Sequence, residues 1–389
     1  MDKSLYLAAM AGRVDDVQSL LSEGADHSVE SEDGLTPLHV ACERGHEGVV
    51  LELLAAGANS ELARYEDGFR AIHFAAQMGH ADTLRVLLRA GVSPRVRTLA
   101  GASPLDIAAQ VGHLEIVQLL LEAGVDYQED FRPGVSPVCL AAQCGHAEIV
   151  HMLLKCGANP GGAGEEDGFA PIHFAAQFDH VGVVKELLQA GEDRDVLVVG
   201  ADYTPLHIAA LNGNRNVVQE LVRAGVKLNS VTGDDGSTAL HLAAQNGHLD
   251  VVQELTDGRA KRAGTEISAQ RKSDGLTPLS VASFEGHVDV VRELIGVGAS
   301  HRVASKSGAT ALFYAAQSGH PHVVRLLLES GADPGAERKD GTTPLHIASR
   351  QGHVGVVWEL LGAGANHRVV NKSGCDALEL ALKAGHTAV

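Results

Sequence analysis

The chain has 389 residues, of which 45% are apolar and only 4% aromatic, and its formal net charge is −18. Phosphate-backbone binding needs clustered Lys and Arg, so this charge balance argues against a nucleic-acid-binding protein. No charged-then-apolar leader opens the chain, and no run of about 18 apolar residues occurs in it. We therefore expect no membrane insertion and a cytoplasmic protein, with the nucleus as an alternative location.

A short phrase recurs along the chain at a fixed period. It reads Gly34-Leu35-Thr36-Pro37-Leu38-His39-Val40-Ala41 near the start and Gly341-Thr342-Thr343-Pro344-Leu345-His346-Ile347-Ala348 near the end. Successive starts are 33 or 34 residues apart, except for one step of 39 between Gly236 and Gly275. A period in this range indicates a stacked array of one supersecondary unit. The other starts are Gly68, Gly101, Gly134, Gly168, Asp202, Gly308 and Gly374.

Each unit is predicted to hold two short helices, as residues 33–58 illustrate. Thr36 can cap the first helix with Pro37 at its first position, and Gly45 can end it in left-handed backbone. A second helix is expected from near Glu47, because its apolar residues follow helical spacing. These are Val49, Val50, Leu53 and Leu54. A polar loop then returns to the next Asp-Gly turn, and stacking of the units buries the apolar faces.

The full pattern, G-x-T-P-L-H-x-A-A-x-x-G-H-x-x-V-V-x-x-L-L-x-x-G-A, resembles the ankyrin repeat. Residues 341–361 give a close copy of it. Eleven phrase starts and an opening unit with Leu7-Ala8-Ala9 make twelve units over essentially the whole chain. The resemblance implies an all-α fold, an ankyrin-repeat solenoid of helix-turn-helix units joined by β-hairpin-like loops.

Departures from the pattern divide the array into five parts. We predict an N-terminal capping repeat, a first run of repeats, a basic insertion or long hairpin, a second run of repeats and an incomplete C-terminal repeat. In that order, their residues are 1–32, 33–256, 257–273, 274–372 and 373–389.

The insertion and the last unit each leave alternatives open. The insertion explains the step of 39 residues and carries Arg259, Lys261 and Arg262 in an acidic protein. We expect a flexible hairpin there, with a contact for an acidic partner, a protease-sensitive hinge or a nuclear signal as the sharper interpretations. The last unit stops where its second helix should begin. Either the chain continues past Val389 or this unit frays.

The sequence predicts no enzyme, with no catalytic residue, no metal site and no cofactor. The 21 histidines mostly recur at fixed places in the unit, which favours structural roles. We expect them to hydrogen-bond loop backbone and to bridge neighbouring units. The close pair His320 and His322 lacks a carboxylate or thiolate at metal-site spacing. Six histidines occupy the Thr-Pro-Leu-His position, namely His39, His73, His173, His207, His241 and His346.

A partner-binding surface is predicted from apolar residues at positions that should face solvent. The resemblance implies that a concave face is built from hairpin tips and the exposed side of the first helices. We take the residue after each Asp-Gly and the two residues before each Gly-His. The predicted partner-binding residues are Phe69, Met78, Val135, Cys144, Phe169, Phe178, Tyr203, Leu211, Leu276 and Phe284.

The alternative for the aromatic residues is that they fold down between neighbouring hairpins. Residues 66–77 return in similar form as residues 166–177, so two similar faces are expected three repeats apart. Phe74, Phe174 and Tyr314 occupy the position of Val40 in other units, and we expect them in the core.

The function predicted from these observations is a non-catalytic protein–protein interaction scaffold or adaptor. It would bind a partner protein on the concave ankyrin surface as a monomer, and nearby acidic residues such as Glu66 and Asp67 would favour a basic partner. The alternative is that the chain is the ankyrin segment of a larger protein whose activity lies elsewhere, such as a kinase, channel, ubiquitin-ligase adaptor or transferase.

Overall fold

The structure is a computed structural model that describes residues 2–125, 136–159, 161 and 168–388. The residues that it describes form 24 helices with connecting loops and no β-strand, so the predicted all-α fold is confirmed. The chain divides into two compact units, Met1–Glu192 and Asp193–Val389. Each unit is a stack of helix pairs.

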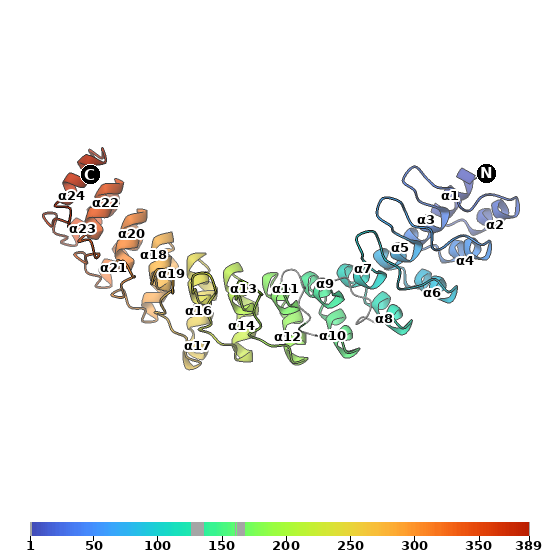
Figure 1. The fold of residues 1–389 in the computed structure, drawn as a ribbon, viewed down its shortest axis with the longest axis horizontal. Coiled ribbons are helices and arrows are strands. Elements are labelled where there is room, and N and C mark those ends of the chain that lie inside the picture. Colours follow the sequence, from blue (N-terminus) through green and yellow to red (C-terminus); the bar gives the residue numbers. More distant parts are fainter. Residues whose placement is uncertain (1, 126–135, 160, 162–167, 389) are drawn as a thin grey trace. The chain divides into compact units, whose positions relative to one another are not determined.

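The first unit contains the helices labelled α1 to α12 (Figure 1), in which odd numbers mark the first helix of each pair. First helices pack on neighbouring first helices, as α3 does on α1 and α5, and second helices pack on second helices, as α4 does on α2 and α6. The bounds are α1 Asp2–Met10, α2 Val14–Ser22, α3 Pro37–Arg44, α4 Glu47–Ala55, α5 Ala71–Met78, α6 Ala81–Arg89, α7 Pro104–Val111, α8 Leu114–Glu122, α9 Pro137–Cys144, α10 Ala147–Lys155, α11 Pro171–Gln177 and α12 Val181–Gln189.

The start and the end of the first helices follow the local chemistry of the repeated phrase. The Thr36 hydroxyl accepts a hydrogen bond from the His39 N–H at the start of α3, and Pro37 needs no partner there because it has no N–H. The helix ends at Gly45, whose φ of 73° is left-handed. A Cβ at Gly45 would also lie 2.6 Å from the His80 ring of the next repeat. Both the left-handed backbone and this close contact therefore require glycine.

The core of the first unit lies between the two layers of helices and between successive repeats. Leu38 from α3 and Val49, Val50 and Leu53 from α4 are fully or almost fully buried. The alanines that end the repeated phrase, such as Ala41, are also buried, and their small size lets adjacent first helices approach closely. This packing of small and branched residues explains how a chain with few aromatic residues builds a core.

The second unit contains α13 to α24 and repeats the same arrangement, with one extra short helix, α17 (Figure 1). Leu206 in α13 and Leu221 in α14 belong to its buried core. The bounds are α13 Pro205–Asn212, α14 Arg215–Ala224, α15 Ala239–Gln245, α16 Leu249–Thr256, α17 Gly258–Arg262, α18 Pro278–Glu285, α19 Val288–Gly296, α20 Ala311–Ser318, α21 Pro321–Glu329, α22 Pro344–Gln351, α23 Val354–Gly362 and α24 Ala377–Lys383.

The basic insertion contains a helix where a flexible hairpin was expected. Asp257 begins α17, and its carboxylate accepts hydrogen bonds from the N–H groups of Arg259 and Ala260, both at 2.8 Å. Ala260 is fully buried, whereas Lys261 and Arg262 face solvent. The insertion therefore adds a separate short helix after α16, which is capped by Asp257 and anchored through Ala260.

The loops between repeats are tight turns that hydrogen-bond to one another. In the loop before α5, the Phe69 carbonyl accepts from the Arg64 N–H at 2.8 Å, which closes the turn. The next loop donates back to it, because the Leu99 N–H lies 2.7 Å from the Asp67 carbonyl. These bonds give the hairpin-like connection that was expected, although the described residues in them are turns without strand pairing.

Candidate partner-binding surface

The loop residue Phe69 is half-buried against the beginning of its own first helix. Its ring centroid lies 5.4 Å from that of His73 and 5.3 Å from that of Phe74, and the Arg64 guanidinium stands 5.7 Å from its centre. Aromatic pairs and cation–π contacts at these distances stabilise the loop. Phe69 is therefore partly a structural residue, and only the remaining part of its ring is open to a partner.

The other loop residues follow the same arrangement. Phe169 lies 5.6 Å from His173 and 5.3 Å from Phe174, so the sequence echo between residues 66–77 and 166–177 is also an echo in structure. Tyr203 meets His207 edge-on with the ring centroids 5.9 Å apart and is half-buried, as is Leu276. Val135 lies outside the described residues.

Two of the three aromatic residues expected in the core are only half-buried. Phe74 is buried beneath Phe69 and Arg64, as expected. Phe174 and Tyr314 keep part of their surface exposed, which corrects the expectation for them. The Tyr314 hydroxyl donates to the Ser305 hydroxyl at 3.0 Å, and this polar contact holds the ring at the edge of the core.

The residues at the ends of the first helices are clearly exposed. Met78, Phe178 and Cys144 lie at this end of α5, α11 and α9, and Met78 and Phe178 are 44% and 46% exposed. Burial raises the pKa of the Cys144 thiol, which keeps it neutral and weakly polar near pH 7. Leu211 and Phe284 in the second unit are exposed as well.

The repeat register separates these exposed residues into two positions. Met78, Cys144 and Phe178 directly precede the residue that ends the helix turn, whereas Leu211 and Phe284 stand one position earlier. Val111 in α7 also directly precedes the residue that ends its helix, and it is 45% exposed. Four consecutive repeats therefore carry an exposed apolar or thiol side chain at this position. We call Met78, Val111, Cys144 and Phe178 the helix-end row.

Val111 was not among the predicted partner-binding residues. The signal that could have found it was its position directly before Gly112, in register with Met78 and Cys144.

Histidines from the second helices hold the backbone beside the helix-end row. His113 donates through Nε2 to the Gln77 carbonyl at 2.9 Å, and His146 and His180 do the same to the carbonyls of Gln110 and Gln143. Each bond joins one repeat to the next, so the predicted bridging role of these histidines is confirmed. The row is thus supported by backbone whose spacing between repeats is fixed.

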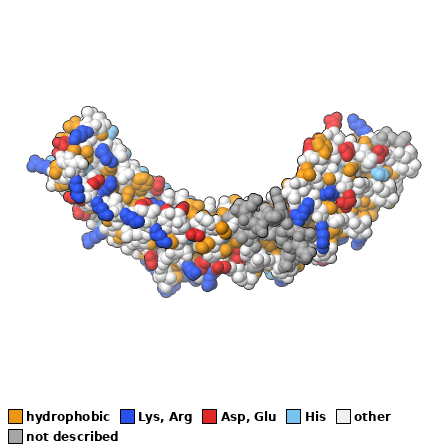
Figure 2. All heavy atoms as spheres, in the orientation of Figure 1, with side chains coloured by type: hydrophobic (Ala, Val, Ile, Leu, Met, Phe, Trp, Pro, Cys, Tyr) orange, Lys and Arg blue, Asp and Glu red, His pale blue; other side chains and the backbone are white. Residues whose placement is uncertain are grey.

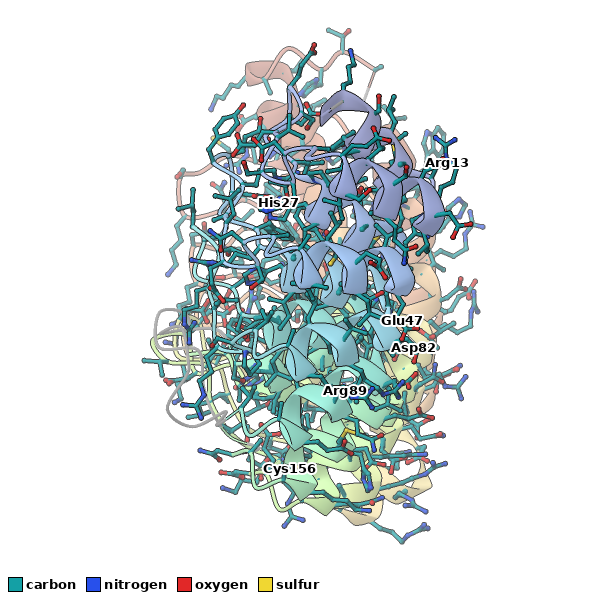
Figure 3. The ribbon with its side chains drawn as sticks, turned by 90° about the vertical axis from the view of Figure 1, so that its right-hand side faces the viewer. Arg13, His27, Glu47, Asp82, Arg89 and Cys156 are labelled. Carbon is teal, nitrogen blue, oxygen red and sulfur yellow. The ribbon has the colours of Figure 1, made fainter. Side chains whose placement is uncertain are left out.

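The loop residues and the helix-end row lie at opposite ends of the first helices. An eight-residue helix such as α5 is about 12 Å long, which separates Phe69 from Met78 by roughly that distance. In Figure 3 the loop with His27 lies on one side of the helices, and Arg13, Glu47 and Asp82 at the beginning of second helices lie on the other. The helix-end row adjoins this second side. The predicted surface is therefore two separate sets of residues.

The described residues offer no arrangement that binds a metal. No group of three or more His, Cys, Asp or Glu side chains among them is placed to hold an ion. The histidine rings of the first helices instead accept from backbone N–H groups, as His39 does from Thr36 at 3.1 Å. None of the described helices has the length and apolar character needed to span a membrane.

Stacked pairs of short helices, joined by turns that hydrogen-bond to each other, define a helical repeat protein. A family model for ankyrin repeats, described as three copies per match, fits successive segments from residue 5 to residue 389. The chain belongs to the ankyrin repeat family. The matched segments are 5–98, 71–131, 105–198, 172–263, 260–338 and 331–389.

Similar proteins share the repeats with this chain over short stretches. Over 58 residues it is 50% identical to ankyrin repeat domain-containing protein 49 of Bos taurus. The aligned stretch covers 15% of this chain and 24% of that protein. Over 60 residues it is 35% identical to protein phosphatase 1 regulatory subunit 27 of Mus musculus, covering 15% and 39%. The chain thus spans well under half the length of these curated relatives.

A solved structure shows the same fold over more of the chain. The crystal structure of the human ASB11 ankyrin repeat domain superposes with a TM-score of 0.51 and is 26% identical. The match covers 57% of this chain and 96% of that one.

Proposed function

We propose that this protein is a non-catalytic scaffold or adaptor that binds a partner protein through the helix-end row. The observation that carries the proposal is the exposure of Met78, Val111, Cys144 and Phe178 at one position of four consecutive repeats. Ankyrin repeats bind protein partners, and relatives of this chain are named as a regulatory subunit. Apolar residues that adjoin one another on a surface mark an interaction site, whereas single exposed apolar residues are normal.

The chemistry of the row suits a protein interface. Burial of apolar surface contributes about 25 cal/mol per Å². Protein interfaces have a hydrophobic core, enriched in aromatic residues and Met, and a polar rim. Gln77, Gln110, Gln143 and Gln177 stand one residue before each member of the row and supply such a polar border. The partner would therefore present a line of apolar side chains with hydrogen-bonding groups beside it.

The charge and the cysteines support the remaining parts of the proposal. A net charge of −18 would steer a basic partner toward the array before apolar contacts form. None of the five cysteines, all within the described residues, forms a disulfide, which favours a reducing compartment such as the cytoplasm.

Paired variants test the proposal by capture from cell lysate with quantitative mass spectrometry. The Val111→Asp/Phe178→Asp variant should lose a protein that the wild-type chain recovers. The matched control is Leu51→Asp on α4, because Leu51 is 48% exposed but lies on a second helix. Circular dichroism should be unchanged in both variants. Phe169 is unsuited to this test, since its ring packs on His173 and Phe174.

Recovery of the same proteins by the wild-type chain and by both variants would contradict the proposal, because the row would then contribute nothing to binding. Loss of the partner from the Leu51→Asp control alone would place the binding surface on the second helices.

A further inference from the structure

Charge is distributed unevenly along this acidic chain. Residues 1–256 contain 16 Lys and Arg against 36 Asp and Glu, whereas residues 257–389 contain 15 against 13. The net charge is therefore −20 for the first part and +2 for the second, and the two add up to the total of −18. The acidity that disfavours anionic partners for the whole chain therefore does not extend to its last repeats.

Four lysines of the last repeats occupy one equivalent loop position. Lys272, Lys306, Lys339 and Lys372 each lie two or three residues before the glycine that opens the repeated phrase, and all four are exposed. We call them the lysine row. Figure 2 shows Lys and Arg side chains spaced along the visible face of these C-terminal repeats.

Backbone hydrogen bonds between successive loops fix the spacing of the lysine row. The Lys306 N–H donates to the Asp274 carbonyl at 2.8 Å, the Lys339 N–H to the Ser307 carbonyl at 3.1 Å, and the Lys372 N–H to the Asp340 carbonyl at 3.0 Å. The four Cα positions are thus held at the spacing of the helix stack, which is about 10 Å per repeat. The backbone of the row therefore needs no ordering when a ligand binds, and only the lysine side chains lose freedom.

The carboxylates near the row are neutralised by other groups. Arg271 pairs with Asp235 at 3.0 Å and with Asp274 at 2.7 Å, and Arg338 pairs with Asp340 at 3.7 Å. No ion pair joins a lysine of the row to any carboxylate of the described residues. The Lys306 ammonium donates to the Lys272 carbonyl, so its charge is oriented along the row. The four positive charges are therefore available to an external anion.

We propose that the lysine row is a docking site for an extended acidic segment of a partner protein. Three residues of a polyproline II segment make one turn and span about 9 Å, so carboxylates at every third residue lie on one face and each meets one lysine per repeat. Each exposed pair contributes little alone, but four in register act together. The acidic first part of the chain would repel a densely charged nucleic acid, so a sparsely acidic polypeptide is the better fit.

This second site is independent of the helix-end row. The lysine row lies in the second unit and at the loops, whereas the helix-end row lies in the first unit at the far end of the first helices. Loss of one site leaves the residues of the other unchanged, and separate variants distinguish them.

Fluorescence anisotropy with a labelled peptide of four Glu-Ser-Ser repeats tests the site on the full chain. The wild-type chain should bind it, and the same peptide with Gln in place of Glu should not bind. Lys306→Gln/Lys339→Gln should weaken binding at least tenfold. The control Lys155→Gln/Lys227→Gln removes the same charge from exposed lysines outside the row and should change binding less than twofold.

Equal weakening by both double variants would overturn the proposal, because binding would then depend on net charge alone. Absence of binding by the wild-type chain would also overturn it. A twelve-nucleotide oligouridine that binds more tightly than the peptide would show a nucleic-acid site instead. Sedimentation that reveals self-association, lost in Lys306→Gln/Lys339→Gln, would assign the row to a second copy of this chain.

Discussion

At the scale of single residues, the histidine near the start of the first helices has a fixed tautomer. The Arg70 N–H donates to His73 Nδ1 at 3.0 Å, so Nδ1 must carry its lone pair. Nε2 then carries the hydrogen and donates to the Val96 carbonyl at 3.2 Å. His241 makes the same two bonds, to the Thr238 N–H and the Leu276 carbonyl. Protonation would break the first bond and place a charge in a buried site.

The stability of the array should therefore fall as the pH decreases from about 6.5 to 4. Burial lowers the pKa of both His73 and His241 to about 4, below the value of about 6.5 in an unfolded chain. The unfolded chain binds protons more tightly in this window, so stability is complete above pH 6.5 and is lost below it. Each histidine contributes a loss on the order of 2 kcal/mol at pH 5.

Urea denaturation between pH 7 and pH 5 measures this effect. His241→Gln should lower stability at pH 7, but its stability should then depend less on pH than that of the wild-type chain. An equal dependence on pH in both proteins would show that His241 does not carry the effect.

At the scale of elements, the repeated phrase contains the information for each helix pair, while the insertion has no counterpart to compare with. Thr36, Pro37 and Gly45 mark the start and the end of α3 as the sequence predicted. Helix α17 was not predicted, because its five residues resemble a polar loop in composition. Its determinants are the Asp257 cap and the burial of Ala260, and that burial depends on packing within the fold.

Removal of the Asp257 cap should loosen α17 without unfolding the array. Asp257→Ala deletes two hydrogen bonds to backbone N–H groups and should cost about 1 kcal/mol of local stability. Trypsin under native conditions should then cleave faster after Arg259, Lys261 or Arg262. Glu266→Ala removes the same charge from an exposed residue nearby and should leave the rate unchanged. Equal rates in the two variants would mean that the cap does not hold this helix.

At the scale of the whole molecule, the fold could be predicted from the sequence far more fully than the binding surface. A period of 33 or 34 residues determines which side chains are equivalent, and twelve-fold repetition confirms each assignment. How far a side chain is exposed depends on the contacts within its own loop. Phe69 is half-buried because His73, Phe74 and Arg64 surround it, and no one-dimensional pattern shows this. Val111 and the lysine row stand in register in the sequence, but their exposure depends on packing that the sequence pattern does not show.

The helix-end row is the proposed binding site for the partner protein, and site-specific photo-crosslinking tests this proposal. A photoreactive phenylalanine analogue at position 111 in α7, in a chain incubated with cell lysate, should crosslink to the partner. The same analogue at position 51 in α4, which has similar exposure, should not. Crosslinking of that partner from position 51 and not from position 111 would contradict the claim, because the partner would then lie on the second helices.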